Sequence, residues 1–415
     1  MGQVNLFEKH MRKLSLFKGN REALYPDYLP DSLPHREKEI DRLAEILVTA
    51  LEGNKPSNVL IFGKTGTGKT AVVRYVGREL KRAEKVYAKK KIEYIYLNCE
   101  TVDTPYSILQ NLGNYFIEDW DEKIPFTGWP MDKVFSTVKE RIDEWNGIVV
   151  LVLDEIDKLV AKSGDDILYQ LLLLDSEMKN SRLSVIGISN ELKFTDLLDP
   201  RVKSRLGQEK LIFSPYNAFQ LQDILSERVK IAVKDDAVSD EVISICAAIA
   251  AQEHGDARRA IDLLRISIEI AEREGAEKVT DRHVYLAKNK IEMDCITEAI
   301  KTLPLHSKIV LLGIALNEEA GNNTLTTGEL YHIYSTLSKR IGASPLTQRR
   351  VSDLISDMDM LGLISTKVKS FGRYGRTKII ELALPVQEVK KIIFEDEFLA
   401  ELNEVKLASQ KKLFF

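Results

Sequence analysis

One segment limits how this chain can fold more than any other: residues 58–80, which read NVLIFGKTGTGKTAVVRYVGREL. Its apolar start predicts a buried strand, its middle a glycine-rich loop, and its end a helix. The loop, GKTGTGKT (63–70), matches the pattern G-x-x-x-x-G-K-[ST], in which backbone N–H groups and a helix N-terminus converge on phosphate oxygens. A glycine-rich turn without a ligand is the alternative, but the flanking strand and helix favour a phosphate-binding loop.

Within such a loop, Lys69 is expected to reach the β- and γ-phosphates of a nucleotide, and Thr70 to hold Mg²⁺. The residues that we expect to bind the nucleotide here are Gly63, Lys64, Thr65, Gly66, Thr67, Gly68, Lys69, Thr70 and Ala71.

A second apolar run, IVVLVLDEIDKL (148–159), ends in two acids. Open α/β sheets bind ligands at the carboxyl ends of their strands, so Asp154 is expected to hold Mg²⁺ and Glu155 to orient and deprotonate the attacking water. Taken alone, two acids after a strand also fit a solvated strand end. Their combination with the loop at 63–70 favours a site of nucleotide hydrolysis.

The apolar runs also predict the fold class. Strands are expected in NVLIFG, IEYIYLN, GIVVLVLD, SVIGISN and KLIFS, with helices between them, which indicates a parallel sheet covered on both faces. After Pro215 only helical patterns follow until about residue 293, and then come two or three helices and a hairpin pattern, LISTKVKSFGRYGRTKIIELA (363–383). We therefore predict five segments: an N-terminal segment (1–35), an α/β domain (36–215), an all-α domain (216–293), a domain with the helix and hairpin pattern of a winged helix (294–395) and a C-terminal helical tail (396–415).

Composition narrows the class of protein. The 415 residues carry a formal net charge of -4, so a nucleic-acid partner would have to be met by local basic patches. The three cysteines lie far apart and the six histidines are scattered, which argues against a disulfide framework or a zinc site. No apolar run approaches the roughly 20 residues of a membrane helix, and the polar N-terminus lacks the apolar core of a signal peptide. A cytoplasmic protein without a membrane partner is expected.

Other polar residues lie near the predicted strand ends. Asn190, after SVIGIS, could hold the hydrolytic water or the γ-phosphate, or could be a turn residue. Arg201 and Arg205 in LLDPRVKSRLG could neutralise phosphate charge, because a guanidinium binds oxygens bidentately, or could be solvated surface residues. Gly255 and Asp256 predict a helix start that brings Arg258 into its first turn.

In this order, these features resemble an AAA+ ATPase. LPHRE (33–37), SPYNAFQL (214–221), GDARRA (255–260) and the C-terminal region narrow the resemblance to the archaeal origin-recognition initiators, relatives of the eukaryotic origin recognition complex and its loading factor. The resemblance extends from about Leu24 to Leu384. It implies an AAA+ domain, a helical lid and a C-terminal winged helix, with ATP or ADP and Mg²⁺ as cofactors.

The resemblance also implies residue roles. Asn190 would be the first sensor of the γ-phosphate and Arg258 the second, and one arginine of the pair Arg201 and Arg205 would act in trans on a neighbour's nucleotide. The segment from Tyr28 to Arg36 would cover the adenine. Tyr216 and Arg228 would also touch the nucleotide, and a packed hinge residue at the domain junction is the alternative for Tyr216.

The C-terminal region contains the candidate for reading DNA. SPLTQRRVSDLISDMDMLGLI (344–364) predicts a helix with Val351, Leu354, Ile355, Met358 and Leu361 on its apolar face. Polar residues at its outer start suit a recognition helix in the major groove. The candidates on this helix are Thr347, Gln348, Arg349, Arg350 and Ser352.

The following hairpin is basic, with five basic residues and no acidic one between Met360 and Ile380. A wing that lies along DNA would explain this cluster, because phosphate affinity depends on local charge. Its candidates are Lys367, Lys369, Arg373, Tyr374, Arg376 and Lys378, with the arginines flanking a tip formed by Gly372 and Gly375. Winged helices also bind proteins, so a solvated edge or a protein contact is the alternative.

The initiators carry a further DNA contact in an insertion before the acidic strand. The matching segment, EDWDEKIPFTGWPM (118–131), departs from this pattern because its four acids would repel phosphate. Thr127, Gly128 and Trp129 remain as candidates to meet a groove.

The function implied by the resemblance is an ATP-binding replication initiator that recognises origin duplex DNA, recruits or loads the replicative helicase, and uses slow ATP hydrolysis as a switch. Its partners would include other copies of itself or related initiators. One alternative is a DNA-binding regulator whose nucleotide is structural. Another is a clamp-loader-like ATPase whose winged helix binds protein.

Overall fold

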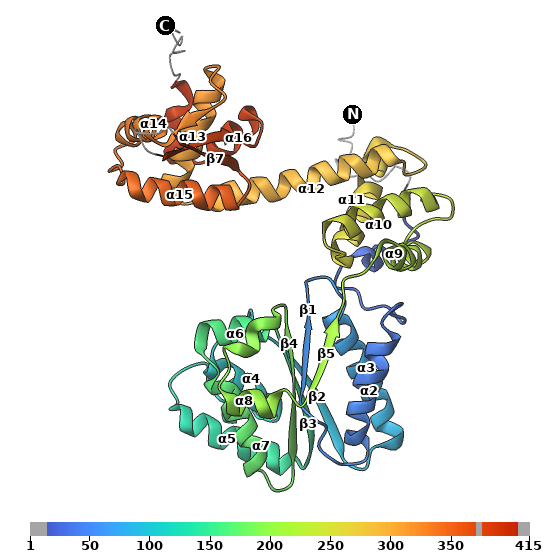
Figure 1. Ribbon diagram of the computed structural model, residues 1–415. Helices are drawn as coiled ribbons and strands as arrows, with labels where there is room; N and C mark the ends of the chain where they lie inside the picture. Colours follow the sequence, from blue (N-terminus) through green and yellow to red (C-terminus); the bar gives the residue numbers. More distant parts are fainter. Residues whose placement is uncertain (1–14, 371–375, 406–415) are drawn as a thin grey trace, which may run out of the picture. The chain divides into compact units, whose positions relative to one another are not determined.

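The computed structural model describes residues 15–370 and 376–405 (Figure 1). The chain divides into two compact units between Ala287 and Lys288. Within the described ranges, no helix is both long and apolar enough to cross a membrane.

A parallel sheet with the strand order β2-β3-β4-β1-β5 forms the centre of the first unit. The strands are β1 (Val59–Gly63), β2 (Lys91–Asn98), β3 (Gly147–Asp154), β4 (Arg182–Ser189) and β5 (Glu209–Phe213). All five predicted strands are present, and the predicted α/β fold class is confirmed. Every residue of β3 is buried, as expected for a central strand covered on both faces.

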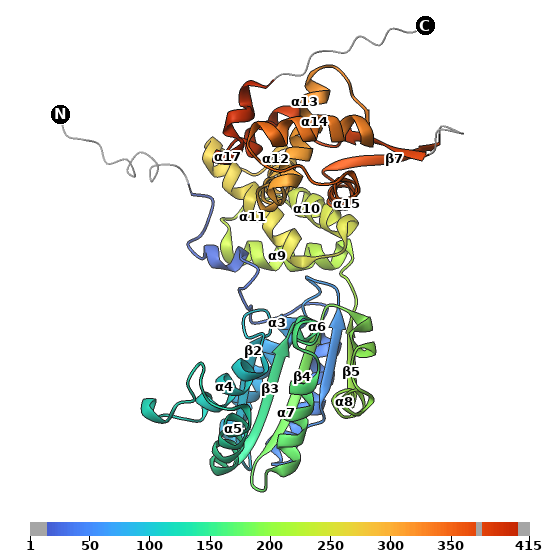
Figure 2. The ribbon, with the colours of Figure 1, turned by 90° about the vertical axis from the view of Figure 1, so that its left-hand side faces the viewer.

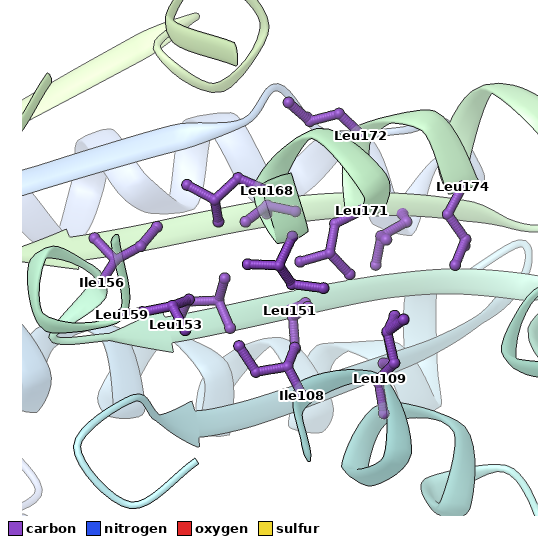
Figure 3. Packing of buried hydrophobic residues seen from close by; sticks show 14 of the residues in the cluster. Ile108, Leu109, Leu151, Leu153, Ile156, Leu159, Leu168, Leu171, Leu172 and Leu174 are labelled. Carbon is purple, nitrogen blue, oxygen red and sulfur yellow. The ribbon is translucent and has the colours of Figure 1, made fainter. Parts of the chain in front are cut away.

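Helices cover the two faces of this sheet (Figures 1 and 2). They are α2 (Glu37–Leu51), α3 (Lys69–Tyr87), α4 (Pro105–Tyr115), α5 (Met131–Trp145), α6 (Ile156–Ser163), α7 (Asp166–Glu177) and α8 (Pro200–Leu206), with short 3₁₀ turns η2 (Trp120–Glu122) and η3 (Leu192–Asp196). Alternate residues of β3 point to opposite cores: Val150 and Val152 join the core under α2 and α3, whereas Leu151 and Leu153 join the other core. Figure 3 shows this second core, with leucines of α6 and α7 against β3.

Helix α3 approaches β2 closely at Gly77. A Cβ atom at this position would lie 2.3 Å from Cε1 of Tyr94. The Tyr94 hydroxyl donates a hydrogen bond to the Val73 carbonyl at 2.8 Å, which fixes the ring under the helix. A residue without a side chain is therefore required here by packing.

The rest of the first unit is helical, as predicted for the region after Pro215. Its elements are η1 (Arg21–Leu24), α9 (Ala218–Ala232), α10 (Asp240–Glu253), α11 (Ala257–Glu274) and the start of α12 (Asp281–Thr302). The last helix was expected to end near residue 293 and is longer, so that the predicted boundary at 293/294 falls inside α12. It continues because Ile296, Ala299 and Ile300 pack into the core of the second unit.

The second unit combines helices with a three-stranded sheet of order β6-β8-β7. Its elements are α13 (Leu305–Glu319), β6 (Leu325–Thr326), α14 (Thr327–Arg340), α15 (Gln348–Met360), β7 (Ile364–Ser370), β8 (Arg376–Leu382), α16 (Val386–Ile393), α17 (Glu397–Ala400) and η5 (Glu401–Glu404). The predicted hairpin is the antiparallel pair β7–β8. Its tip, and the end of the predicted tail after residue 405, lie outside the described residues.

Candidate functional site

A cavity of about 380 Å³ lies in the first unit where the strand ends meet the helical region. Its lining comes from four sources: the segment Pro26–Pro34, the loop residues Thr65–Ala71, the ends of strands β2, β3 and β4, and helices α9 and α11. The predicted residues that line it are Tyr28, Thr65, Gly66, Thr67, Gly68, Lys69, Thr70, Ala71, Asp154, Glu155, Asn190, Tyr216, Arg228 and Arg258.

The loop between β1 and α3 is packed so tightly that it requires glycine. Gly66 has a φ of +66°, and a Cβ atom there would lie 1.7 Å from Oδ1 of Asp256. The Ala257 N–H also donates to the Gly66 carbonyl at 3.1 Å. The start of α11 therefore rests directly on the loop, which links the helical region to the predicted phosphate site.

Lys69 is the buried cation of the site and is only 6% exposed. Its Nζ donates to the carbonyls of Gly63 and Lys64, both at 2.7 Å, and to Oδ1 of Asn190 at 2.9 Å. The pKa of Lys69 is lowered to about 8, first by burial and also by the positive charge of Arg258, although the Asp154 carboxylate opposes this shift. The site therefore contains a desolvated ammonium group suited to an anion.

Asp154 accepts hydrogen bonds on both carboxylate oxygens. Its Oδ2 accepts from the hydroxyls of Thr70 and Tyr96, both at 2.7 Å, and its Oδ1 accepts from the Glu155 N–H at 2.9 Å. Burial first, and then the bond to Asp154, raise the pKa of Tyr96, so the phenol remains a donor. Hydroxyl and carboxylate oxygens held together in this way are the ligands that Mg²⁺ prefers.

Glu155 follows Asp154 in a left-handed backbone conformation, with a φ of 57°. Its Oε2 lies 2.5 Å from Nζ of Lys158, one turn along α6. The next strand contributes Asn190, whose backbone N–H donates to Asp157 at 3.3 Å. The acids and the amide predicted from separate strands thus meet at one edge of the sheet.

The N-terminal segment is bound to the helical region by Arg228. This guanidinium donates to the carbonyls of Ala23 at 3.1 Å and Tyr28 at 3.0 Å, and lies 4.9 Å from the centre of the Tyr28 ring. Glu272 of α11 fixes the same segment further on, by accepting from the Leu16 N–H at 2.8 Å. Residues 15–34 therefore form a strap, which passes from the helical region to the cavity.

Three residues predicted to contact nucleotide, Arg36, Gly63 and Lys64, are described by the structure but are absent from the cavity lining. Arg36 is buried and donates through Nε to the Tyr216 hydroxyl at 2.9 Å and through Nη2 to the Ser214 carbonyl at 2.6 Å. These bonds engage its donors within the protein. Arg36 therefore holds the Tyr216 side chain in place and does not line the cavity itself. The Gly63 and Lys64 carbonyls bind Lys69 instead.

Arg201 and Arg205 also lie away from the cavity lining, on α8. Arg201 is exposed, and its Nε lies 3.1 Å from Oδ1 of Asp199. Arg205 is exposed as well. The fold brings neither guanidinium to the phosphate loop of its own chain.

Sequence reasoning missed further residues in or beside the cavity, among them Arg74, Tyr96, Glu100 and Lys158. Arg74 lies 4.4 Å from the centre of the Tyr96 ring. The pairing of Asn98 with Asp154 in the β2–β3 register puts the end of β2 beside the acids. An alternation of side chains in IEYIYLN was a signal for Tyr96. The contacts of the other three depend on packing that no local pattern reveals.

The DNA-reading candidates on α15 are mostly exposed. Thr347 caps the helix by accepting from the Arg350 N–H at 3.4 Å, and Gln348, Arg349 and Arg350 are exposed, whereas Ser352 is half-buried. The buried residues are Val351, Ile355 and Met358. Leu361, predicted on the same face, is 55% exposed because the helix ends at Met360.

The hairpin candidates divide into described and undescribed residues. Lys367 and Lys369 lie on β7, and Nζ of Lys367 is 3.7 Å from Glu381. Nζ of Lys378 donates to the Ser356 hydroxyl at 2.7 Å, which ties β8 to α15, and its contact with phosphate stays a prediction. Arg373, Tyr374 and the glycines of the tip lie outside the described residues, as does the side chain of Arg376.

The DNA-contact candidates in the acidic insertion differ in their exposure to solvent. Thr127 and Gly128 are exposed, but Trp129 is half-buried against the core. Nζ of Lys133 lies 3.6 Å from the centre of the Trp129 ring. Trp129 therefore packs against the core, and only the exposed part of its ring is available to contact a DNA groove.

Known families match along most of the chain. Residues 32–186 match an AAA ATPase domain, residues 222–289 a Cdc6 AAA+ ATPase-type lid domain, and residues 298–392 the CDC6 C-terminal winged helix domain. The predicted order of an AAA+ domain, a lid and a winged helix is thus confirmed.

Close relatives extend over the full length. The chain is 51% identical over 410 residues to an ORC1-type DNA replication protein of Thermococcus kodakarensis, covering 99% of this chain and 98% of that protein. It is 51% identical over 413 residues to ORC1-type DNA replication protein 1 of Methanosarcina acetivorans, with the same coverage.

Among solved structures, the Aeropyrum pernix ORC1 protein in complex with DNA matches with a TM-score of 0.80 and 44% identity, covering 94% of this chain and 100% of that one. The fold, at 22% identity and a TM-score of 0.58, is also that of Cdc6p from Pyrobaculum aerophilum, over 92% of this chain and 99% of that one. The suspected resemblance is confirmed: this chain belongs to the family of ORC1-type DNA replication proteins.

Proposed function

We propose that this chain is an ATP-dependent replication initiator that binds and slowly hydrolyses ATP in the cavity and binds origin duplex DNA through its C-terminal unit. One observation carries the nucleotide part. Lys69, Asp154, Glu155 and Asn190 come from three separate strand ends and meet in one cavity, into which α11 brings Arg258. Residues brought together from such distant positions are typical of a site that acts on phosphate.

The residues fit a bound Mg²⁺. The Thr70 hydroxyl and the Asp154 carboxylate are hard oxygen ligands whose oxygens already lie 2.7 Å apart. When bound, Mg²⁺ neutralises charge on the phosphates. Lys69 binds the phosphate oxygens, Glu155 accepts the proton of the attacking water, and Asn190 orients that water or the γ-phosphate.

Nucleotide state would reach the lid through Arg258. Its first-turn position is fixed because the Asp256 side chain caps α11 by accepting from the Arg258 N–H at 2.7 Å. Arg201 or Arg205 would act on the nucleotide of another copy or of a related initiator, which agrees with their exposure on α8.

The DNA part is supported by the exposed polar start of α15 and by the basic hairpin that follows it. The related ORC1 protein of Aeropyrum pernix, 44% identical, has been solved in complex with DNA. Gln348 and Arg349 are the proposed readers of base edges, and the wing residues are the proposed phosphate contacts. Recruitment or loading of the replicative helicase belongs to the same proposal.

The test of the nucleotide part is Glu155→Gln. The variant should bind ATP with unchanged affinity, while single-turnover hydrolysis falls by about 10²–10⁴-fold, the usual contribution of a positioned general base. Normal hydrolysis in this variant would transfer the role elsewhere, with Asn190 as the next candidate.

A second candidate function is a DNA-binding regulator whose nucleotide is structural. It is favoured by the ion pair of 2.5 Å between Glu155 and Lys158, since a restrained base suits a nucleotide that is kept. Helicase recruitment on origin DNA separates the two functions: an initiator recruits the helicase and a regulator does not.

A further inference from the structure

Lys158 joins two carboxylates beside the cavity. Its Nζ lies 2.5 Å from Oε2 of Glu155 and 2.8 Å from Oε1 of Glu100, which follows the end of β2. The hydrogen bond to Glu100 and then the close contact with Glu155 raise the pKa of Lys158, so that the side chain stays charged. Both acids also line the cavity.

The position of the Glu155 carboxylate depends on this contact. The left-handed backbone at Glu155 fixes the direction in which its side chain leaves the chain, and the remaining freedom is rotation about the side-chain bonds. While the ammonium group lies this close to Oε2, an attacking water cannot approach that oxygen from the same side. The ion pair therefore selects one arrangement of the carboxylate and occupies one of its oxygens.

We propose that Lys158 is a positioning residue that restrains Glu155 and thereby limits the rate of ATP hydrolysis. This inference rests on the proposed role of Glu155 as the base. The Lys158 ammonium group holds Oε2 of Glu155 beside α6 and Glu100, and separation of this ion pair frees the carboxylate to rotate toward a bound water.

The size of the restraint follows from exposure. The side chains of Lys158 and Glu155 are 46% and 23% exposed, so water screens part of their attraction. Ion pairs of this kind are weak, and their loss corresponds to an increase in the hydrolysis rate of about twofold to fivefold.

The experiment compares single-turnover hydrolysis at saturating ATP and Mg²⁺ in the full chain and in Lys158→Met. We expect a twofold to fivefold faster rate, with the dissociation constant for ATP unchanged. Lys158→Arg retains a cation at this position and should keep the rate near that of the parent. A change in ATP affinity that matches the change in rate would indicate a general structural effect and would overturn the proposal.

The chain offers a matched control in Lys162. This residue lies one turn further along α6 and pairs with Asp103, so it ties the same helix to the same connection after β2 without touching Glu155. Lys162→Met should leave hydrolysis unchanged. An equal acceleration in both variants would mean that loosening of α6 is the cause, and Lys158 would lose its specific role.

A final pair of variants separates the inference from the proposed function. If Glu155→Gln hydrolyses ATP normally, the role of Glu155 fails. If Glu155→Gln abolishes hydrolysis but Lys158→Met is no faster than the parent, only the inference fails. In the Glu155→Gln background, Lys158→Met should not change the rate of ATP hydrolysis. Lys158→Gln repeats the comparison with a polar, uncharged side chain.

Discussion

At the scale of single residues, the glycine-rich loop 63–70 contains a buried lysine, Lys69. Because the pKa of Lys69 is lowered to about 8, part of the population is neutral at pH 8 and nearly all of it is charged at pH 6.5. A bound polyanion favours the charged form. Lys69 should therefore contribute an uptake of about half a proton to ATP binding at pH 8 and almost none at pH 6.5.

Calorimetry in buffers of different ionisation enthalpy measures this uptake. Lys69→Arg is the control, because a guanidinium remains protonated throughout this range and should remove the contribution of residue 69 to the uptake. Equal uptake at both pH values in the parent protein would contradict the lowered pKa.

Tyr96 offers a second prediction at this scale. Tyr96→Phe removes one of the two hydroxyls that donate to Oδ2 of Asp154. Loss of a partner that orients a metal ligand typically weakens metal affinity by about 10–100-fold, so half-maximal hydrolysis should require at least about tenfold more Mg²⁺. Tyr94→Phe is the matched control two residues earlier, since its hydroxyl binds the Val73 carbonyl. A similar Mg²⁺ requirement in both variants would contradict the role of Tyr96.

At the scale of elements, the strap should control how long a nucleotide stays bound. Arg228→Met removes both hydrogen bonds to the strap carbonyls of Ala23 and Tyr28. Each bond from a charged donor contributes about 1.5–3 kcal/mol, so dissociation of a fluorescent ADP should accelerate at least tenfold. Lys18→Met, which removes only an exposed pair with Asp235 at the start of the strap, should change the rate little. Unchanged dissociation in Arg228→Met would show that the strap does not retain the nucleotide.

The elements also show what the sequence can and cannot predict. The five strands and the acids at their ends were predictable because apolar runs and strand-end positions are local properties. The end of α12 was predicted wrongly, since the packing of Ile296 and Ile300 that extends it involves distant parts of the chain. Arg36 was expected to contact the nucleotide but does not line the cavity. Only the fold reveals that its guanidinium donates to the Tyr216 hydroxyl and the Ser214 carbonyl.

At the scale of the whole molecule, the two units have separate hydrophobic cores. Lys69→Met should therefore abolish ATP binding and leave the second unit folded and able to bind duplex DNA. Calorimetric titration with ATP and a gel-shift assay on one preparation check both statements.

The matching change in the second unit is Arg349→Ala. It should weaken DNA binding and retain ATP affinity. Because Arg349 is a proposed reader of base edges, discrimination between sequences should fall while the slope of log affinity against log salt stays the same. A slope reduced by about 0.9 would instead indicate a phosphate contact. A loss of DNA binding in Lys69→Met as large as that in Arg349→Ala would contradict the independence of the units.

The contact between Gly77 and Tyr94 has a consequence for the evolution of this protein, because the two positions constrain each other. With a Cβ atom at position 77 only 2.3 Å from the tyrosine ring, a mutation of Gly77 to a larger residue is harmful while Tyr94 is present and becomes tolerable after Tyr94 has been replaced by a smaller residue. The two mutations are then tolerated only if the replacement of Tyr94 comes before that of Gly77. Variants of this gene that carry a larger residue at one of these positions should accordingly be found with a smaller one at the other.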